Sequence, residues 1–254
     1  MSSGPYARLG EEAEENQIRS WFLEDLPWPE VGRRLARDPR LILPVGALSQ
    51  HGPHLPLGTN TLITERVAME TAGAARVLMA PTFRYGVWSP GKERYAGSSG
   101  VRRKTLHRAI NDLLAKWEDH GIQEFFILTA YQHEPHLDAL LMAMTSSAST
   151  TVVNLFSIDA SDLLEASPHT EHAGELETSL MLHLAPHLVH LDQATDMKAD
   201  SKTYRRYAQG RVATPPPGSR GTLGFPSRGS AEKGEAVFIR YVESLIEILS
   251  EEPS

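Results

Sequence analysis

The sequence predicts an α/β protein whose sheet is mainly parallel and covered by helices on both faces. Short apolar runs recur along the chain, and longer segments with helical apolar spacing separate them. Strands that alternate with helices form parallel sheets, because each helix carries the chain back across a face of the sheet. The chain has 254 residues, of which 41% are hydrophobic and 22% charged, so it can bury a core without disulfide or metal support.

Four apolar runs are the expected strands. Each is too short for a helix, which is typical of a buried strand in an α/β protein. They span residues 41–45, 76–80, 125–128 and 151–156.

The expected helices lie before, between and after these runs. They span residues 28–37, 61–71, 101–119, 135–144, 172–184 and 230–249. The clearest is 101–119, where Leu106, Ile110 and Leu114 recur at helical spacing and Gly121 follows as a stop.

Two segments stand outside this alternation. Residues 1–20 are acidic and rich in small residues and are expected to form a loose tail, so that residues 21–254 make one domain. Residues 193–230 are rich in proline, glycine and basic side chains and show no strong periodicity. A long irregular segment inside a compact domain is usually a lid, a binding loop or an oligomer contact. It is not a linker between domains, because a single helix follows it.

Composition excludes several classes of function. The absence of cysteine excludes disulfides, thiolate zinc sites and a cysteine nucleophile, and it suits a reducing compartment. The formal net charge of -7 gives no general attraction to nucleic acid or to an anionic membrane. No apolar run approaches the roughly 18 residues of a membrane span, and the N-terminus has no signal-peptide core. The chain is therefore expected to be cytoplasmic.

Histidines follow the first and third expected strands, where ligands bind in parallel sheets. The loop SQHGPHLPLGTN, residues 49–60, holds His51 and His54 around a glycine and a proline. Two imidazoles in a stiff loop suit a divalent metal ion, although both could be ordinary polar loop residues. The loop TAYQHEPH, residues 129–136, contributes Tyr131 and His133. These too could either belong to a functional site or be ordinary polar loop residues.

A third polar group opens the expected helix 172–184. His172, Glu175 and Glu177 lie in its first turns. The two glutamates flank the apolar stripe, so one can face the cleft while the other faces water. The alternative is that these acidic residues only favour the helix dipole.

Four segments together resemble the signatures of the creatininase family of amidohydrolases. PVGALSQHGPHLPLGTN, residues 44–60, resembles PxGSxEQHGPHLPLxTD, and HAGELETSLML, residues 172–182, resembles HAGxxETSLML. GTLGFPSRGSAEKG, residues 221–234, resembles GxxGxPxxASAEKG, and PTFRYGVWSPGKERYAGS, residues 81–98, is a weaker match to PxxxYGxSxxHxxFPGT. The matches run in order across about residues 40–240. The resemblance implies a three-layer α/β/α sandwich, a hexameric assembly and a two-metal zinc or manganese site that opens a cyclic amide or cuts a related C–N bond.

The chain departs from the family pattern at metal-ligand positions. The family's first glutamate ligand falls on Ser49, its bridging aspartate on Asn60 and its second histidine on Tyr131. His133 stands where creatininase has a further glutamate, although a two-residue shift of this segment would place the family's histidine on His133. The resemblance keeps His51 as a ligand, His172 as the proton shuttle and Glu177.

These substitutions leave three hypotheses. Two dications about 3.5–4 Å apart need a bridging anion, which asparagine does not supply, so the full two-metal site is not expected. The first hypothesis is a hydrolase with one zinc or manganese ion on His51, His133 and Glu177, with His172 and Glu177 as catalytic residues. Its substrate would be a small-molecule amide, and the arginines of 205–228 could bind an anionic one. The second is a metal-free pseudoenzyme that serves as a binding or structural subunit, and the third is a metal-independent enzyme that uses Ser49 as nucleophile. A homo-oligomer is expected in either of the first two cases.

Overall fold

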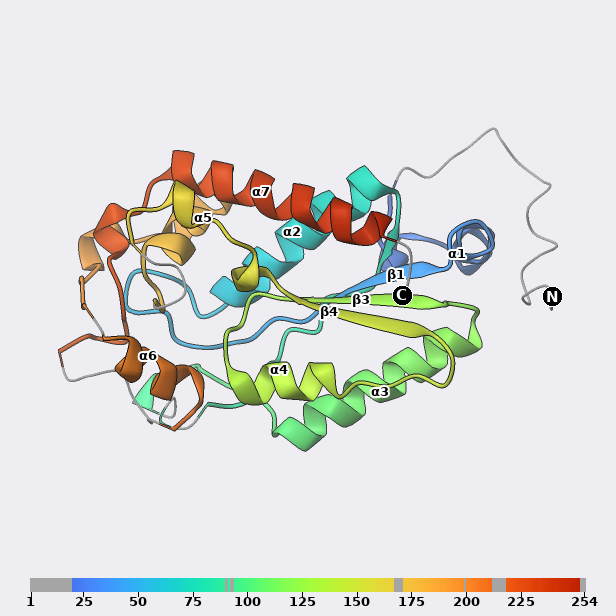
Figure 1. The fold of residues 1–254 in the computed structure, drawn as a ribbon, viewed down its shortest axis with the longest axis horizontal. Helices are drawn as coiled ribbons and strands as arrows, with labels where there is room; N and C mark the ends of the chain where they lie inside the picture. The colour runs from blue at the N-terminus through green and yellow to red at the C-terminus, as the bar shows by residue number, and fades with distance from the viewer. Residues whose placement is uncertain are drawn as a thin grey trace.

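The computed structural model describes residues 20–89, 91, 94–166, 171–198, 200–211 and 218–251, and its strands form a parallel sheet between two layers of helices (Figure 1). The strand order is β2-β1-β3-β4, and every pair within the described sheet is parallel. The strands are β1 (Arg40–Pro44), β2 (Leu78–Met79), β3 (Glu124–Thr129) and β4 (Ser149–Asn154). Apart from Ser20, the expected tail 1–20 lies outside the described residues.

The helices cover the two faces of this sheet. They are α1 (Trp28–Leu35), α2 (Thr59–Ala75), α3 (Arg103–Asp119), α4 (Glu134–Leu141), α5 (Glu175–Leu184), α6 (Ser201–Ala208) and α7 (Ala231–Ser250). Helices α2, α5 and α7 lie on one side and α3 and α4 on the other (Figure 1). This arrangement confirms the predicted three-layer α/β/α sandwich.

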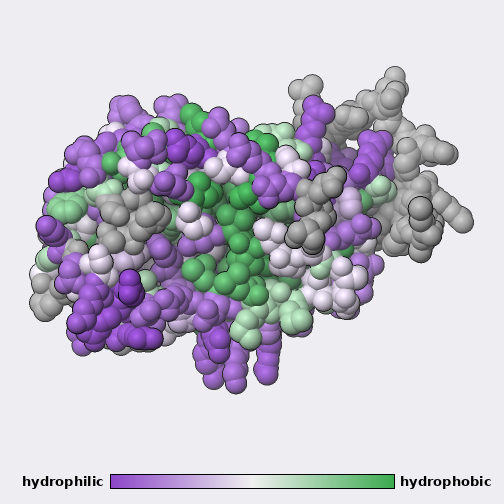
Figure 2. All heavy atoms as spheres, viewed as in Figure 1, coloured by the Kyte–Doolittle hydropathy of each residue, from purple (hydrophilic) through white to green (hydrophobic). Residues whose placement is uncertain are grey.

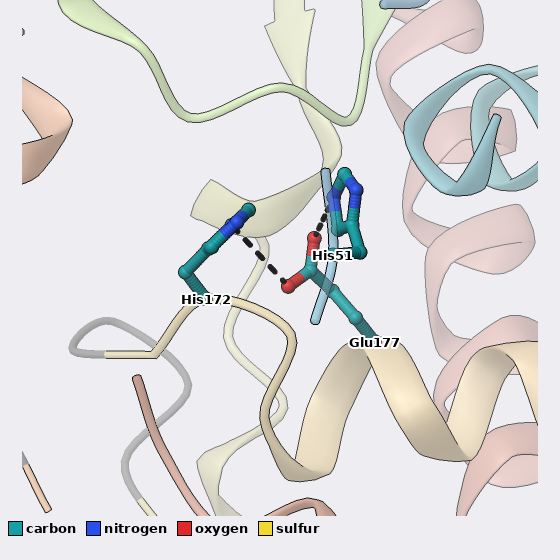
Figure 3. A group of neighbouring side chains, drawn as sticks. All are labelled: His51, His172 and Glu177. Carbon is teal, nitrogen blue, oxygen red and sulfur yellow. Dashed lines mark hydrogen bonds and ion pairs between the residues drawn. The ribbon is translucent and has the colours of Figure 1, made fainter. Parts of the chain in front are cut away.

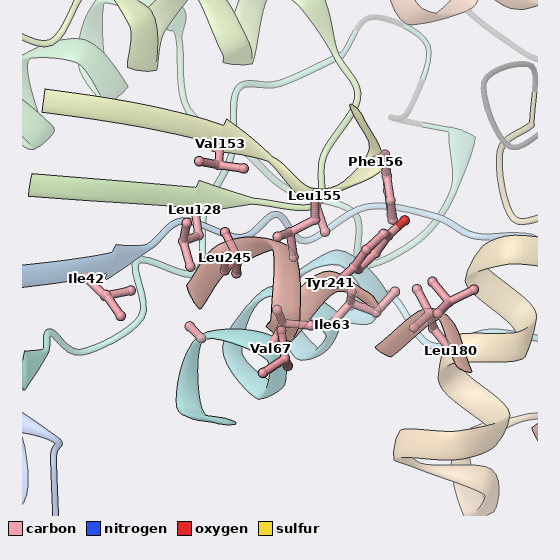
Figure 4. Close-up of a cluster of buried hydrophobic side chains, with 14 of the residues drawn as sticks. Ile42, Ile63, Val67, Leu128, Val153, Leu155, Phe156, Leu180, Tyr241 and Leu245 are labelled. Carbon is pink, nitrogen blue, oxygen red and sulfur yellow. The ribbon is translucent and has the colours of Figure 1, made fainter. Parts of the chain in front are cut away.

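The sequence makes both faces apolar through alternation along each strand. In β1, Leu41 and Leu43 belong to the hydrophobic cluster under α3 and α4, whereas Ile42 belongs to the opposite cluster under α2, α5 and α7. Figure 4 shows this second cluster, in which Tyr241 of α7 packs near Leu155 and Phe156. A strand buried on both faces reads as a continuous apolar run, which is why these short runs predict strands.

Several element boundaries differ from the sequence prediction, and two of them have an identifiable cause. The second strand was expected over 76–80 but covers only Leu78–Met79, because Arg76 has a positive φ of 57° and ends α2 there. The helix expected from residue 172 begins at Glu175. His172 instead pairs with Leu223 in an isolated antiparallel bridge, which ties the segment before α5 to the later loop.

The irregular segment 193–230 contains a helix that periodicity does not predict. Helix α6 begins after Asp200, whose side chain accepts a hydrogen bond from the N–H of Thr203 at 2.7 Å. Its buried residues, Tyr204 and Tyr207, are three apart and face the rest of the protein. The N-cap and this tyrosine pair are the two sequence signals that could have located the helix.

Helices α5 and α7 pack with almost no space between their backbones at one point. A Cβ atom built on Gly234 of α7 would overlap the carbonyl group of Ser179 in α5. This close approach helps to fix α5, whose first turn carries Glu177. No described helix is both long and apolar enough to cross a bilayer.

Candidate functional site

A narrow pocket lies beyond the carboxyl ends of β1 and β3, where the strand-end rule places a ligand. Its walls come from the first turn of α2, the loop after β3, the segment that opens α5, and α6. About 30 Å³ of it can hold the centre of a water molecule. That space suits one or two waters or a small reacting group.

Three buried side chains converge in this region: His51, His172 and Glu177 (Figure 3). One nitrogen of each histidine and one carboxylate oxygen all lie within 4.8 Å of one another. His51 Nε2 is 3.1 Å from Glu177 Oε1, and His172 Nδ1 is 4.0 Å from Glu177 Oε2. His51 comes from the loop after β1, His172 from the segment before α5 and Glu177 from the first turn of α5.

The outer nitrogen of each histidine is held by a backbone carbonyl. His51 Nδ1 donates to the Ser49 carbonyl at 2.8 Å, and His172 Nε2 lies 3.0 Å from the Gln50 carbonyl. Because a carbonyl only accepts, the Ser49 carbonyl assigns a hydrogen to Nδ1 of His51, whereas Nε2 of His172 lies between an acceptor, the Gln50 carbonyl, and a donor, the Gln50 side-chain amide nitrogen at 3.1 Å. A neutral His51 ring therefore presents its Nε2 lone pair towards Glu177, and the 3.1 Å hydrogen bond between Nε2 and Glu177 Oε1 needs a second proton on that ring. Such a group repels itself unless a proton or a metal cation lies within it, and a backbone carbonyl is a usual orienting partner for the other nitrogen of a metal-bound histidine.

Glu177 is held as an anion despite its burial. Burial by itself would raise its pKa, but the charge and hydrogen bond of His51, the charge of His172 and the N–H of Ala173 together lower the pKa to about 2. The Asn60 amide also donates to Glu177 Oε1, at 3.3 Å. The carboxylate is therefore available as the negative ligand of a cation.

The three substituted positions supply no further anion. Asn60 Nδ2 donates to the carbonyl of Ala130 at 2.6 Å, so the amide nitrogen rather than an oxygen faces Glu177. The hydroxyl of Ser49 is buried and has no hydrogen-bond partner among the described residues. Burial raises the pKa of Tyr131, which stays a neutral phenol and donates to the Val87 carbonyl at 3.4 Å. These residues fit one divalent ion and do not fit a pair.

His133 lines the same pocket but is outside the group of three. Its Nδ1 donates to the Ala208 carbonyl at 3.1 Å, which leaves its lone pair on Nε2. The structure thus brings His51 and Glu177 of the predicted metal set together with His172 in the place of His133. His54 is buried beside Thr178. Its burial and the nearby charge of His51 lower its pKa to about 4, so it is a neutral packing residue near the site.

The expectation that one of the two glutamates of α5 faces water is wrong. Glu175 is completely buried. Its carboxylate accepts hydrogen bonds from the N–H groups of Glu165 and Ala166 and pairs with Lys233 of α7 at 2.5 Å. A partner far along the chain thus neutralises a carboxylate that the local pattern placed in solvent.

Glu171 is a pocket residue that sequence reasoning missed. Its carboxylate accepts from the N–H of Glu175 at 2.7 Å and of Phe225 at 3.0 Å, so it joins the start of α5 to the 218–230 segment. Burial raises its pKa to about 7, although both N–H groups act in the opposite direction. Gly224, with a φ of 137°, leaves room for this carboxylate, because a Cβ atom there would lie 2.6 Å from Glu171 Oε1.

Helix α6 forms one wall of the pocket through its two tyrosines. Tyr204 donates from its hydroxyl to Gln132 Oε1 at 3.0 Å, and Gln50 Nε2 donates to the Tyr207 hydroxyl at 3.3 Å. The basic residues of this helix do not line the pocket, and its described walls contain no lysine or arginine. The suggestion that the arginines of 205–228 bind an anionic substrate at the catalytic site is therefore not supported.

Comparison with known proteins gives a consistent set of relatives. A family model described as "Creatininase: Creatinine amidohydrolase" matches residues 24–249. The creatinine amidohydrolase of Pseudomonas putida is 28% identical over 257 residues, covering 92% of this chain and 98% of the relative. The mycofactocin precursor peptide peptidase of Mycolicibacterium smegmatis is 29% identical over 216 residues, covering 80% of this chain and 81% of the relative.

Solved structures show the same fold. A crystal structure of creatinine amidohydrolase superposes with a TM-score of 0.77 at 24% identity, covering 92% of this chain and 99% of the other. A structure described as "Creatininase Mn" has a TM-score of 0.76 at 25% identity, and a mutant creatininase of "Zn-Zn type" has 0.75 at 25% identity. Each of these two covers 91% of this chain and 97% of the other chain.

Proposed function

Because the chain belongs to the creatininase family, we propose that it is a hydrolase of an amide or cyclic-amide C–N bond that uses one divalent metal ion. The observation that carries this proposal is the orientation of His51 and His172, whose inner nitrogens face one buried carboxylate. Two imidazoles and a carboxylate are a sufficient protein ligand set for a catalytic zinc. Zinc is the metal we propose, with manganese as the alternative, since relatives are described in both forms.

The residues that would hold the ion are His51, His172 and Glu177. An ion there would act as a Lewis acid, polarising a carbonyl and making a water molecule more acidic. Glu177 offsets its charge in a buried setting. The lone pair on His133 Nε2 can accept a proton within the same pocket, so His133 takes the proton-transfer role that the sequence suggested for His172.

Other pocket residues position the substrate. Asn60 Oδ1 is buried and has no hydrogen-bond partner among the described residues, so it can accept the N–H of an amide. Tyr204 and Tyr207 close the wall opposite and exclude bulk water, which strengthens the electrostatic interactions inside. The substrate class that fits is a small uncharged or N–H-bearing amide.

The proposal predicts turnover that depends on His172. Zinc-loaded protein would be offered creatinine and short peptides, because relatives are named as a creatinine amidohydrolase and a precursor peptide peptidase. His172→Ala is expected to lower the rate on any substrate that is turned over by roughly 100-fold or more, since it removes a ligand. His187→Ala, at an exposed histidine of the same chain, is the matched control.

Two results would contradict the proposal. Turnover that His172→Ala leaves unchanged would place the chemistry elsewhere. Protein that contains no metal, takes up none on titration and hydrolyses nothing would instead favour a binding or structural subunit without catalysis.

We also propose that the chain forms a homo-oligomer, with a hexamer as the expected size. Strand β4 is at an edge of the described sheet and offers unpaired backbone groups. Figure 2 shows an apolar stripe across the middle of this face, over β4. Nearby in sequence, Leu141, Met142 and Met144 are 66%, 54% and 74% exposed, which is unusual for a monomer surface.

Light scattering coupled to size-exclusion chromatography would measure the assembly. We expect a mass several times the 28.1 kDa of one chain. Met142→Glu together with Met144→Glu should shift that mass downwards, because charge at an apolar interface is costly to bury. A monomer at tens of micromolar would contradict this part of the proposal. The cytoplasmic location and the absence of nucleic-acid partners stay predictions.

A further inference from the structure

The outer face of α6 carries a cationic groove that is separate from the pocket beneath it. The groove is lined by Lys202, Arg205, Arg206 and Arg211, with Ser201 and Gln209, and no carboxylate is among the described residues that line it. All four basic residues are exposed. None of their side chains forms an ion pair within the part of the chain that the structure describes. Figure 2 shows the corresponding hydrophilic patch at the lower left, over α6.

This charge arrangement works against the helix that carries it. Lys202 is three residues from Arg205 and four from Arg206, and like charges at these spacings destabilise a helix. Arg205 and Arg206 lie in the last turn and favour the helix dipole, but Lys202 in the first turn opposes it. An isolated helix of eight residues is in any case marginal in water. An anion in the groove would remove the repulsion.

The groove suits a compact anion rather than a long polyanion. The groove is open to solvent, and its volume of about 510 Å³ can admit a small molecule. The protein as a whole has a formal net charge of -7, so a nucleic acid or an anionic membrane would meet repulsion beyond the groove. A small ligand with several phosphate or carboxylate groups can use all four cations without touching the acidic surface.

The same helix connects this groove to the pocket. Tyr204 and Tyr207, on the inner face of α6, form a wall of the pocket. Among the described residues, the hydroxyl of Tyr204 hydrogen-bonds the side chain of Gln132, and that of Tyr207 the side chain of Gln50. We propose that the outer face of α6 is a binding site for a small multivalent anion, and that its occupation fastens α6 over the pocket. The anion site does not rest on the proposed hydrolase activity.

Calorimetric titration of metal-free protein at low ionic strength tests the site. The probes are inorganic tripolyphosphate for the phosphate class and citrate for the carboxylate class, and the tighter binder identifies the class. Metal-free protein is used because both probes chelate zinc. We expect one anion per chain, with binding weakened at least tenfold by Arg205→Glu together with Arg206→Glu.

Lys104→Glu with Arg108→Glu makes the same change of charge on the exposed face of α3 and is the matched control. Arg205→Ala with Arg206→Ala is a milder pair of substitutions for the case in which the charge reversal unfolds α6. Equal binding by the wild type and by both α6 variants would overturn the site. The same conclusion would follow if neither tripolyphosphate nor citrate bound.

Hydrogen exchange of residues 201–208 tests the connection to the pocket. Tripolyphosphate at saturation is expected to slow backbone exchange in α6 by several-fold in the wild type and in the α3 control. If the anion binds but exchange in α6 does not slow, the proposal that binding fastens α6 over the pocket is wrong, whereas the anion site itself stands.

Discussion

Zinc is expected to bind the purified protein at one ion per chain, and Glu177→Gln is expected to weaken that binding by roughly 100-fold or more. The substitution keeps the shape of the side chain but removes the only negative charge of the group formed with His51 and His172. It also replaces one acceptor oxygen with an amide group that must face the two rings. The remaining two imidazoles are too few to hold the ion tightly.

Competition against a zinc-binding dye would measure the affinity, and elemental analysis would give the stoichiometry. Glu171→Gln is the matched control, because Glu171 lines the same pocket yet hydrogen-bonds the N–H groups of Glu175 and Phe225 instead of facing the histidines. It should leave zinc affinity within a few-fold of the wild type. Two ions per chain, or equal loss in both variants, would contradict a single site on His51, His172 and Glu177.

Gly234→Ala is expected to destabilise the protein by about 3 kcal/mol, at the upper end of the cost of overpacking. The added methyl group would overlap the backbone carbonyl of Ser179, which cannot rotate away as a side chain would. Helices α5 and α7 must therefore separate. For a chain of this size the melting temperature should fall by roughly 6–12 °C.

Gly73→Ala in α2 is the control with the opposite sign. A Cβ atom at Gly73 meets nothing within 4 Å, and the residue is exposed in the interior of a helix. Alanine should therefore stabilise the protein by about 0.5–1 kcal/mol. Thermal unfolding followed by circular dichroism measures both variants. A Gly234→Ala protein as stable as the wild type would show that α5 and α7 can shift apart at little cost, which would weaken the account of how Glu177 is positioned.

The fold could be predicted from the sequence because its signals are local. The strand at Leu41–Leu43 alternates between two apolar clusters, so it reads as an unbroken apolar run wherever it lies in the sheet. Helix α6 gave no such signal. Its buried face consists of only two tyrosines, and its stability comes from contacts with distant residues such as Gln50 and Gln132.

The candidate site was predictable in part, because some of its residues also lie in local sequence signals. The resemblance located His51, His172 and Glu177, and the substitutions at Ser49 and Asn60 indicated one ion rather than two. The sequence could not show that His172, rather than His133, joins His51 and Glu177, since that depends on the bridge between His172 and Leu223. Nor could it show that Glu175 is neutralised by Lys233, which reaches it from α7.

The two histidine rings are oriented by consecutive peptide groups, those of Ser49 and Gln50. A mutation replaces a side chain but leaves the carbonyl of the main chain in place. The side chain at position 49 can therefore drift among small polar and apolar types while both imidazoles keep their orientation. The main chain of this loop, rather than its side chains, thus sets the direction of both imidazoles.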